Sequence, residues 1–174
     1  MADQKISQLT ELTAVAGADL VPIVDVSANE TKYIKYSNIN NYTLTLLHGG
    51  FSPADSTTYY FGGAYGSSPT SSGSTYYRLY IPKAGVINHI DTTMINSGTF
   101  ASTEDSTLAI RLNDTTDYTL TSVLKYNANG GYYPLPSQSI AVAAGDYIVA
   151  KWITPAWVTN PTGVIHNITL FITS

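Results

Sequence analysis

Apolar and polar residues alternate in several short runs along the second part of the chain. The clearest example is TLAIRLN at 107–113, where Leu108, Ile110 and Leu112 alternate with Ala109, Arg111 and Asn113. A period of two residues is typical of a β-strand that buries one face. The same pattern predicts strands in YTLTLL (42–47), STTYYF (56–61), TYYRLYI (75–81), GVINHIDTTMI (85–95), YTLTSVLKY (118–126), SIAVA (139–143), DYIVAKWIT (146–154) and GVIHNITLFIT (163–173).

Turn residues separate these runs at short intervals. Segments rich in Gly, Pro, Asn, Asp and Ser stand between them: GSSPTSSGS (66–74), PKAG (82–85), NANGG (127–131), AAGD (143–146) and NPTG (160–163). Short strands with such punctuation are typical of a β-sandwich or barrel. No run keeps a helical period and no internal repeat is visible. The sequence therefore predicts an all-β head domain over 42–174, with a Ser/Gly-rich loop at 62–74.

Residues 1–41 form a second region with a different pattern. KISQLTEL (5–12) predicts a short helix, and LVPIVDVSANETKYIKYSNI (20–39) predicts a β-hairpin with apolar residues on both faces. So short a segment rarely builds a sufficient core alone, so another surface must cover the hairpin. That surface is either the head domain of the same chain or another protein. We favour another protein, contacted by Ile6, Leu9, Leu20, Ile23, Val24, Val26, Tyr33, Ile34 and Tyr36.

The composition narrows the classes of function. Charged residues make up only 11% of the chain, against roughly 25% in ordinary soluble domains. The net charge of -4 and the scattered Lys and Arg residues argue against nucleic-acid binding. No apolar run is long enough to predict a membrane span, and the polar start MADQKISQLTEL lacks the apolar core of a signal peptide. We therefore expect synthesis in the cytoplasm and no membrane insertion.

Catalytic and metal-binding patterns are sparse. The sequence has no cysteine and no G-x-S-x-G, H-E-x-x-H, P-loop or G-x-G-x-x-G motif. His48, His89 and His166 lie in separate predicted strands without ligand spacing, and we expect each to be a half-buried strand residue. We expect no catalytic residue, no cofactor and no metal. A depolymerase would need a convergent pair of acids across a cleft, which these turns do not supply.

A calcium site is the alternative for the acidic residues near one predicted turn. The stretch EDSTLAIRLNDTTD (104–117) brings Glu104, Asp105, Asp114 and Asp117 to strand ends, where carboxylates and carbonyls could hold the ion. The dense D-x-D-x-D-G spacing of calcium loops is missing. Solvated turn acids are therefore the favoured interpretation.

Tyrosine is the one enriched residue type with binding chemistry, with 14 copies. Tyr65, Tyr76, Tyr132 and Tyr133 stand beside Gly, Ser and Asn, a composition found in adaptable recognition surfaces. Their rings could stack on sugars, which would make a host-surface polysaccharide a partner. The alternative is that the same rings pack between sheets or between subunits.

Two strands near the C-terminus carry apolar residues on both faces. These residues include Ile148 and Trp152 in DYIVAKWIT, and Ile165 and Phe171 in GVIHNITLFIT. In a sandwich of this size, the second apolar face needs a cover that another copy of the subunit can supply. We therefore expect these four residues at an interface between copies.

Two segments of the head resemble a known module. SIAVAAGDYIVAKW (139–152) resembles the strand, Gly-Asp turn and strand of C1q/TNF-like trimeric jelly rolls, and YRLYIPKAGVINHI (77–90) resembles the opening of such modules in phage proteins. The resemblance covers roughly residues 52–174. It implies a jelly-roll β-sandwich that assembles as a homotrimer.

The N-terminal region resembles a leader of tailed-phage virion proteins. The shared elements are KISQL (5–9), a spacer with Ala and Asp, LVPIVD (20–25), a turn, and TKYI (31–34) before Asn38–Ile39. The resemblance implies attachment to the virion, through the major capsid protein or another virion protein. We expect a head fibre or capsid decoration protein located in the virion. The alternative is a receptor-binding tail fibre or spike.

Overall fold

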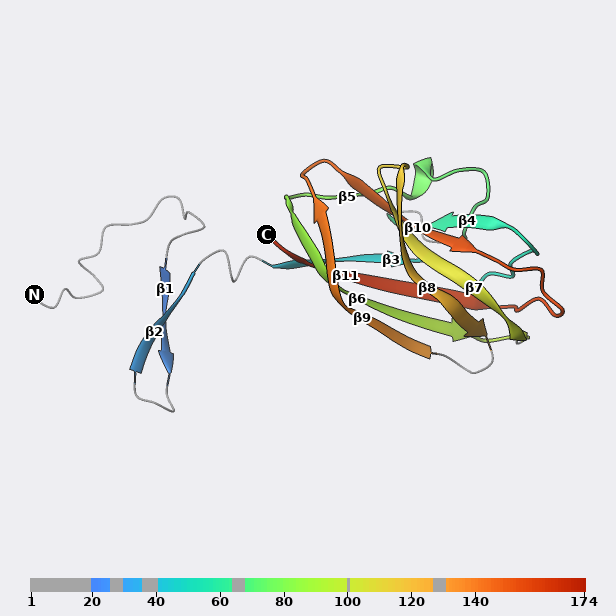
Figure 1. Cartoon of the computed structure of the whole chain (residues 1–174), viewed down its shortest axis with the longest axis horizontal. Coiled ribbons are helices and arrows are strands. Elements are labelled where there is room, and N and C mark those ends of the chain that lie inside the picture. The colour runs from blue at the N-terminus through green and yellow to red at the C-terminus, as the bar shows by residue number, and fades with distance from the viewer. Residues whose placement is uncertain (1–19, 26–29, 36–40, 64–67, 100, 127–130) are drawn as a thin grey trace, which may run out of the picture. The chain divides into compact units, whose positions relative to one another are not determined.

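The computed structural model describes residues 20–25, 30–35, 41–63, 68–99, 101–126 and 131–174 (Figure 1). The chain divides into two compact units, Met1–Asn41 and Tyr42–Ser174, and each is described by itself. Within the described residues, no helix is long and apolar enough to cross a membrane.

The N-terminal unit contains one antiparallel hairpin. Strand β1 (Leu20–Asp25) pairs with β2 (Glu30–Lys35), and the register sets Val21 opposite Ile34 and Ile23 opposite Lys32. The hairpin that the sequence predicts is therefore confirmed. The helix predicted over 5–12, and the predicted contact residues Ile6, Leu9, Val26 and Tyr36, lie outside the described residues.

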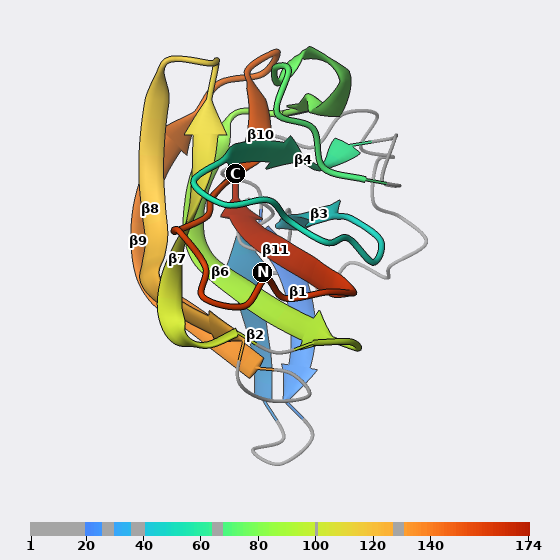
Figure 2. The ribbon, with the colours of Figure 1, turned by 90° about the vertical axis from the view of Figure 1, so that its right-hand side faces the viewer.

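The head contains two antiparallel sheets. One has the order β3 (Tyr42–Leu47), β11 (Val164–Thr173), β6 (Gly85–Asn96) and β9 (Gly131–Val142). The other has the order β4 (Thr58–Phe61), β10 (Tyr147–Ile153), β7 (Ala101–Leu112) and β8 (Thr116–Tyr126), with the short β5 (Leu79–Tyr80) also on β10. Figure 2 shows the last strand, β11, beside β6.

The order of the strands defines the fold. The first and last strands of the head, β3 and β11, are neighbours, and the chain passes repeatedly from one sheet to the other. Two sheets wound in this way, each with four main strands and one with the short β5 added, form a jelly roll, which is built from two Greek keys. The predicted all-β jelly-roll sandwich is therefore confirmed.

The core lies between the two sheets. Strand β11 alternates strictly: Val164, His166, Ile168 and Leu170 are fully buried, and the residues that alternate with them are half-buried. Strand β10 supplies Ile148 and Trp152 to the same core, and both have 0% exposure.

The burial of β10 corrects the predicted interface between copies. Ile148 and Trp152 lie inside a single subunit, so they cannot form a surface for another copy. Val149 alternates with them and is also fully buried within the chain. The chain itself therefore covers Val149 on the second face of this strand, and Ile153 at the end of the strand is the apolar residue of that face that stays exposed.

Two strand boundaries also differ from the predictions. The predicted strand TYYRLYI is a 3-10 helix, η4 (Thr75–Tyr77), followed by the short β5. Conversely, β9 begins at Gly131 rather than near Ser139, although the added part includes Pro134 and Pro136. Proline is tolerated there because β9 is an edge strand that pairs with β6 alone among the described strands. On its other side, a missing backbone N–H group costs no hydrogen bond of the sheet.

One buried hydroxyl gives a stability prediction. Thr92 on β6 has 0% exposure, and its Oγ1 atom has no hydrogen-bond partner among the described residues. Replacement by the isosteric Val removes an unsatisfied polar atom, so Thr92→Val is expected to raise the free energy of unfolding by about 1 kcal/mol in urea titrations. The control is Thr93→Val on the exposed face, which is expected to change little; an equal gain there would contradict the explanation.

Candidate functional site

The outer face of the sheet β3-β11-β6-β9 carries an unusual share of apolar side chains. Side chains opposite one another in an antiparallel sheet point to the same face. On β11 the half-buried Ile165 and Phe171 point away from the core, and Ile165 pairs with Ile95 of β6. The large apolar side chains exposed on this face are Leu47, Val86, Ile95 and Tyr132.

The register brings these residues into rows across the sheet. Leu47 of β3 lies opposite Asn167 of β11, which lies opposite Thr93 of β6, which lies opposite Tyr132 of β9. Threonines at 45, 93 and 169 and the uncharged Asn167 lie between the apolar positions. An exposed apolar area of this kind is typical of a protein contact.

One polar cluster interrupts the apolar surface. The Tyr132 hydroxyl donates to Asp91 Oδ1 at 2.7 Å, and His89 Nε2 lies 2.8 Å from the same oxygen. The hydrogen bond from Tyr132, with a further contribution from His89, holds the pKa of the Asp91 carboxyl below its usual range. The ring of His89 meets that of Phe171 edge-on, with 5.2 Å between centroids. The cluster is thus continuous with the apolar face.

The structure joins residues that the sequence assigned to different sites. Tyr132 was expected to contact glycan and Phe171 to contact another copy, yet both lie on this face: Tyr132 shares the Asp91 carboxylate with His89, and the His89 ring contacts Phe171. Tyr133, the neighbour of Tyr132, is partly buried against the core instead. Tyr76 lies on η4, which is not part of this sheet, and is 77% exposed. Tyr65 lies outside the described residues, so the described tyrosines form no single platform.

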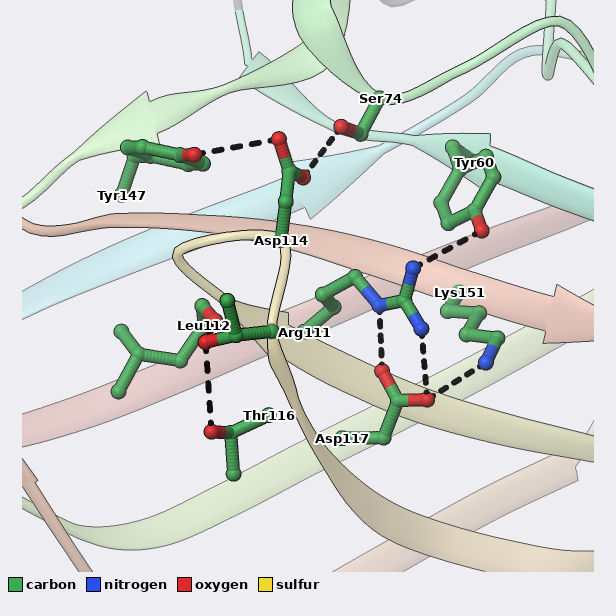
Figure 3. A network of polar contacts seen from close by, with 10 residues as sticks. Tyr60, Ser74, Arg111, Leu112, Asp114, Thr116, Asp117, Tyr147 and Lys151 are labelled. Atoms are coloured by element: carbon green, nitrogen blue, oxygen red, sulfur yellow. Dashed lines mark hydrogen bonds and ion pairs between the residues drawn. The ribbon is translucent and has the colours of Figure 1, made fainter.

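The other sheet carries an ionic network on its outer side (Figure 3). Arg111 donates to both carboxylate oxygens of Asp117, at 2.6 and 3.0 Å, and Lys151 donates to Asp117 Oδ2 at 2.5 Å. Arg111 also donates to the hydroxyl of Tyr60. The hydrogen bond from Arg111 is the main cause of the lowered pKa of Asp117. These side chains are partly exposed, so their contribution to stability is screened by solvent.

A second carboxylate at the β7–β8 turn fixes a neighbouring loop. Asp114 accepts hydrogen bonds from Ser74, Arg78 and Tyr147. Burial alone would raise the pKa of Asp114, but these hydrogen bonds outweigh it and lower the pKa. Because Ser74 and Arg78 flank η4, a single carboxylate holds both ends of that short helix.

The acids considered as calcium ligands accept hydrogen bonds from protein groups, as far as their contacts are described. Asp117 is bound by two cationic side chains, and Glu104 Oε1 accepts from the backbone N–H of Val158. Within the described ranges, no three His, Asp or Glu side chains gather in a way that could hold a metal ion. The calcium alternative has no support in this geometry.

Two histidines behave differently from the sequence-based expectation. His48 and His166 were expected to be half-buried in unrelated strands, but both have 0% exposure and their rings are hydrogen-bonded. The pairing depends on the β3–β11 register, which joins positions 118 residues apart. No local sequence pattern reports such a contact.

Comparison with known proteins adds little to this description. No protein-family model and no curated protein sequence matches the chain. Among solved structures, the chain is similar to one titled "Crystal Structure of FLHE", with 10% sequence identity and a TM-score of 0.45. The match covers 77% of this chain and 98% of that one.

Proposed function

We propose that the chain is a non-enzymatic structural protein of a tailed-phage particle. In this proposal it is a head fibre or capsid decoration protein, made in the host cytoplasm and carried in the virion. Residues 1–41 attach it to the major capsid protein or another virion protein, and residues 42–174 form the displayed head. The C1q/TNF-like character of the head belongs to the same proposal.

The observation that carries the proposal is the division of the chain into two compact units. The smaller unit holds the leader motif and a two-stranded hairpin, which is marginal in water unless something covers it. The larger unit has its own core between two sheets. This arrangement supports a separate attachment segment and a self-sufficient head.

The apolar outer face of β3-β11-β6-β9 supports assembly of the head as a homotrimer. Leu47, Val86 and Ile95 are exposed there beside the half-buried Ile165 and Phe171. A second copy of the chain covers such a face in the way that a subunit interface does. The interface proposed from the sequence therefore keeps Ile165 and Phe171, while Ile148 and Trp152 are removed from it.

Deletion of residues 1–41 tests the attachment. The remaining chain, 42–174, is expected to retain a β-rich circular-dichroism spectrum, because the described core residues all belong to it, and to be missing from purified particles, because it lacks the attachment segment. The matched control is full-length Val158→Asp, whose exposed loop position leaves both units intact and which should enter particles normally. Particles that incorporate the truncated head as well as the full chain would refute the attachment role.

A further inference from the structure

The buried His48–His166 pair lies where the first strand of the head is fastened to the last. His48 directly follows β3, and His166 is the third residue of β11. His48 Nε2 lies 2.8 Å from His166 Nδ1, and His48 Nδ1 lies 2.6 Å from the carbonyl oxygen of Gly49. Both nitrogens of His48 are therefore engaged.

The contacts define where the protons are. The Gly49 carbonyl can only accept, so His48 Nδ1 carries a hydrogen and, in the neutral ring, Nε2 does not. The proton between the rings is then on His166 Nδ1. A second proton on His48 would sit on Nε2 and would face the His166 Nδ1–H group at 2.8 Å unless His166 moved its own hydrogen to Nε2. Protonation of His48 therefore requires a rearrangement of the pair as well as a positive charge on a fully buried ring.

The described rings packed around the pair are uncharged. From the opposite sheet, Phe61 of β4 lies 4.5 Å from His48 and Trp152 of β10 lies 4.7 Å from His166, measured between ring centroids. Met94 of β6 lies opposite His166. Trp152 also contacts the ring of Tyr59 and donates to Ser106, the neighbour of the half-buried Asp105. The fully buried residues of the described structure include no Asp, Glu, Lys or Arg.

The electrostatic consequence agrees with this packing. Burial lowers the pKa of His48 to about 4 and holds the pKa of His166 well below the ordinary 6.5. Because an exposed histidine binds its proton at higher pH, the open state takes up more protons than the closed state as the solution is acidified. The stabilisation from the neutral pair is present in full above pH 6.5 and is lost as pH falls towards about 4.

Strand β3 is the element most easily released by loss of the pair. It is an edge strand, and among the described strands it pairs with β11 alone, whereas β11 also pairs with β6 along its full length. Leu46 is its one fully buried residue, Tyr42 and Leu44 pack partly against the core, and the Tyr42 hydroxyl donates to the Lys83 carbonyl. Backbone hydrogen bonds follow between His48 and His166 and between Phe51 and Val164. Local opening is cheapest where an element has one neighbour and few buried residues.

We propose that the His48–His166 pair is an acid-sensitive clasp for β3, the strand through which residues 1–41 are joined to the head. Protonation drives His48 out of the core, and β3 separates from β11 while the remaining strands stay folded. The proposal depends neither on attachment to a virion nor on the number of subunits.

Amide hydrogen exchange of the full chain tests the clasp. After correction for intrinsic exchange, the protection of the β3 amides is expected to fall by about 30-fold between pH 7.5 and pH 5. This factor follows if His48 binds one proton with a pKa of 6.5 when β3 is open and of about 4 when it is closed. Amides of β6 and β10 that exchange only through global unfolding should lose at least as much protection, because unfolding exposes the same histidines, but they should stay better protected than β3 at both pH values. Unchanged β3 protection, or β3 amides as well protected as those of β10 at pH 5, would overturn the proposal.

Matched substitutions assign the effect to its residue. His48→Gln retains an acceptor for His166 but does not titrate, so it should remove most of the pH dependence. His89→Gln, on the outer face, should leave the dependence as in the native chain. The reverse result for either variant contradicts the clasp. If His48→Gln does not fold, the ring resonances of native His48 decide instead: they must titrate together with the loss of β3 protection.

Discussion

Phe171→Asp is expected to behave as an 18.7 kDa monomer in light scattering, whereas the native chain is expected to have three times that mass. Phe171 lies on the outer face of β11, so the substitution leaves the core between the sheets intact. In an assembled trimer it would bury a second carboxylate beside the His89–Asp91 pair, whose imidazole already binds Asp91. An uncompensated buried charge costs roughly 3–5 kcal/mol, enough to dissociate a modest interface.

The matched control introduces the same charge elsewhere. Val158 is 84% exposed in the loop between β10 and β11, away from the apolar face, so Val158→Asp should have the native mass. Retention of the native mass by Phe171→Asp would exclude this sheet face as the interface. A monomeric native chain at micromolar concentration would exclude the trimer itself.

Trp152→Ala is expected to lower the free energy of unfolding by about 4 kcal/mol, within the range for large aromatic truncations in protein cores. The indole is fully buried and contacts the rings of Tyr59 and His166, at 5.6 and 4.7 Å between centroids. Its Nε1 also donates to Ser106 Oγ at 3.0 Å. The truncation removes this packing between the sheets as well as the hydrogen bond.

Urea titration followed by far-ultraviolet circular dichroism measures this loss, since tryptophan fluorescence would itself change with the substitution. The control is Ile153→Ala at the next position of β10, where the side chain points outward and is partly exposed. Its expected cost is below about 1 kcal/mol. Similar losses for the two variants would contradict the assignment of Trp152 to the core.

Local pattern was sufficient for the strands that bury one face. The alternation in 107–112 and in 164–173 follows directly from contact with a core on one side, and both segments are strands. The pattern failed for 131–138 because the edge position of β9 permits prolines that a central strand would exclude. It failed for Thr75–Tyr77 because hydrogen bonds to Asp114, distant in sequence, fix that turn.

The candidate site could be predicted only in part. The sequence identified Ile165 and Phe171, since their side chains alternate with the buried residues of β11. It could not reveal that Leu47 and Ile95 flank that strand, because this depends on a register between distant segments. Trp152 was misassigned because apolar residues on both faces of a strand have the same pattern whether the cover is intramolecular or a second subunit.

The prolines of β9 affect how readily copies of this chain would pair edge to edge at high concentration. With 11% charged residues, the chain has little electrostatic repulsion to keep copies apart. A long edge strand would then invite edge-to-edge pairing and fibrillar growth. Pro134 and Pro136 cannot donate backbone hydrogen bonds, so β9 is a poor template for an additional strand. The two proline rings thus disfavour aggregation through this edge without adding charge.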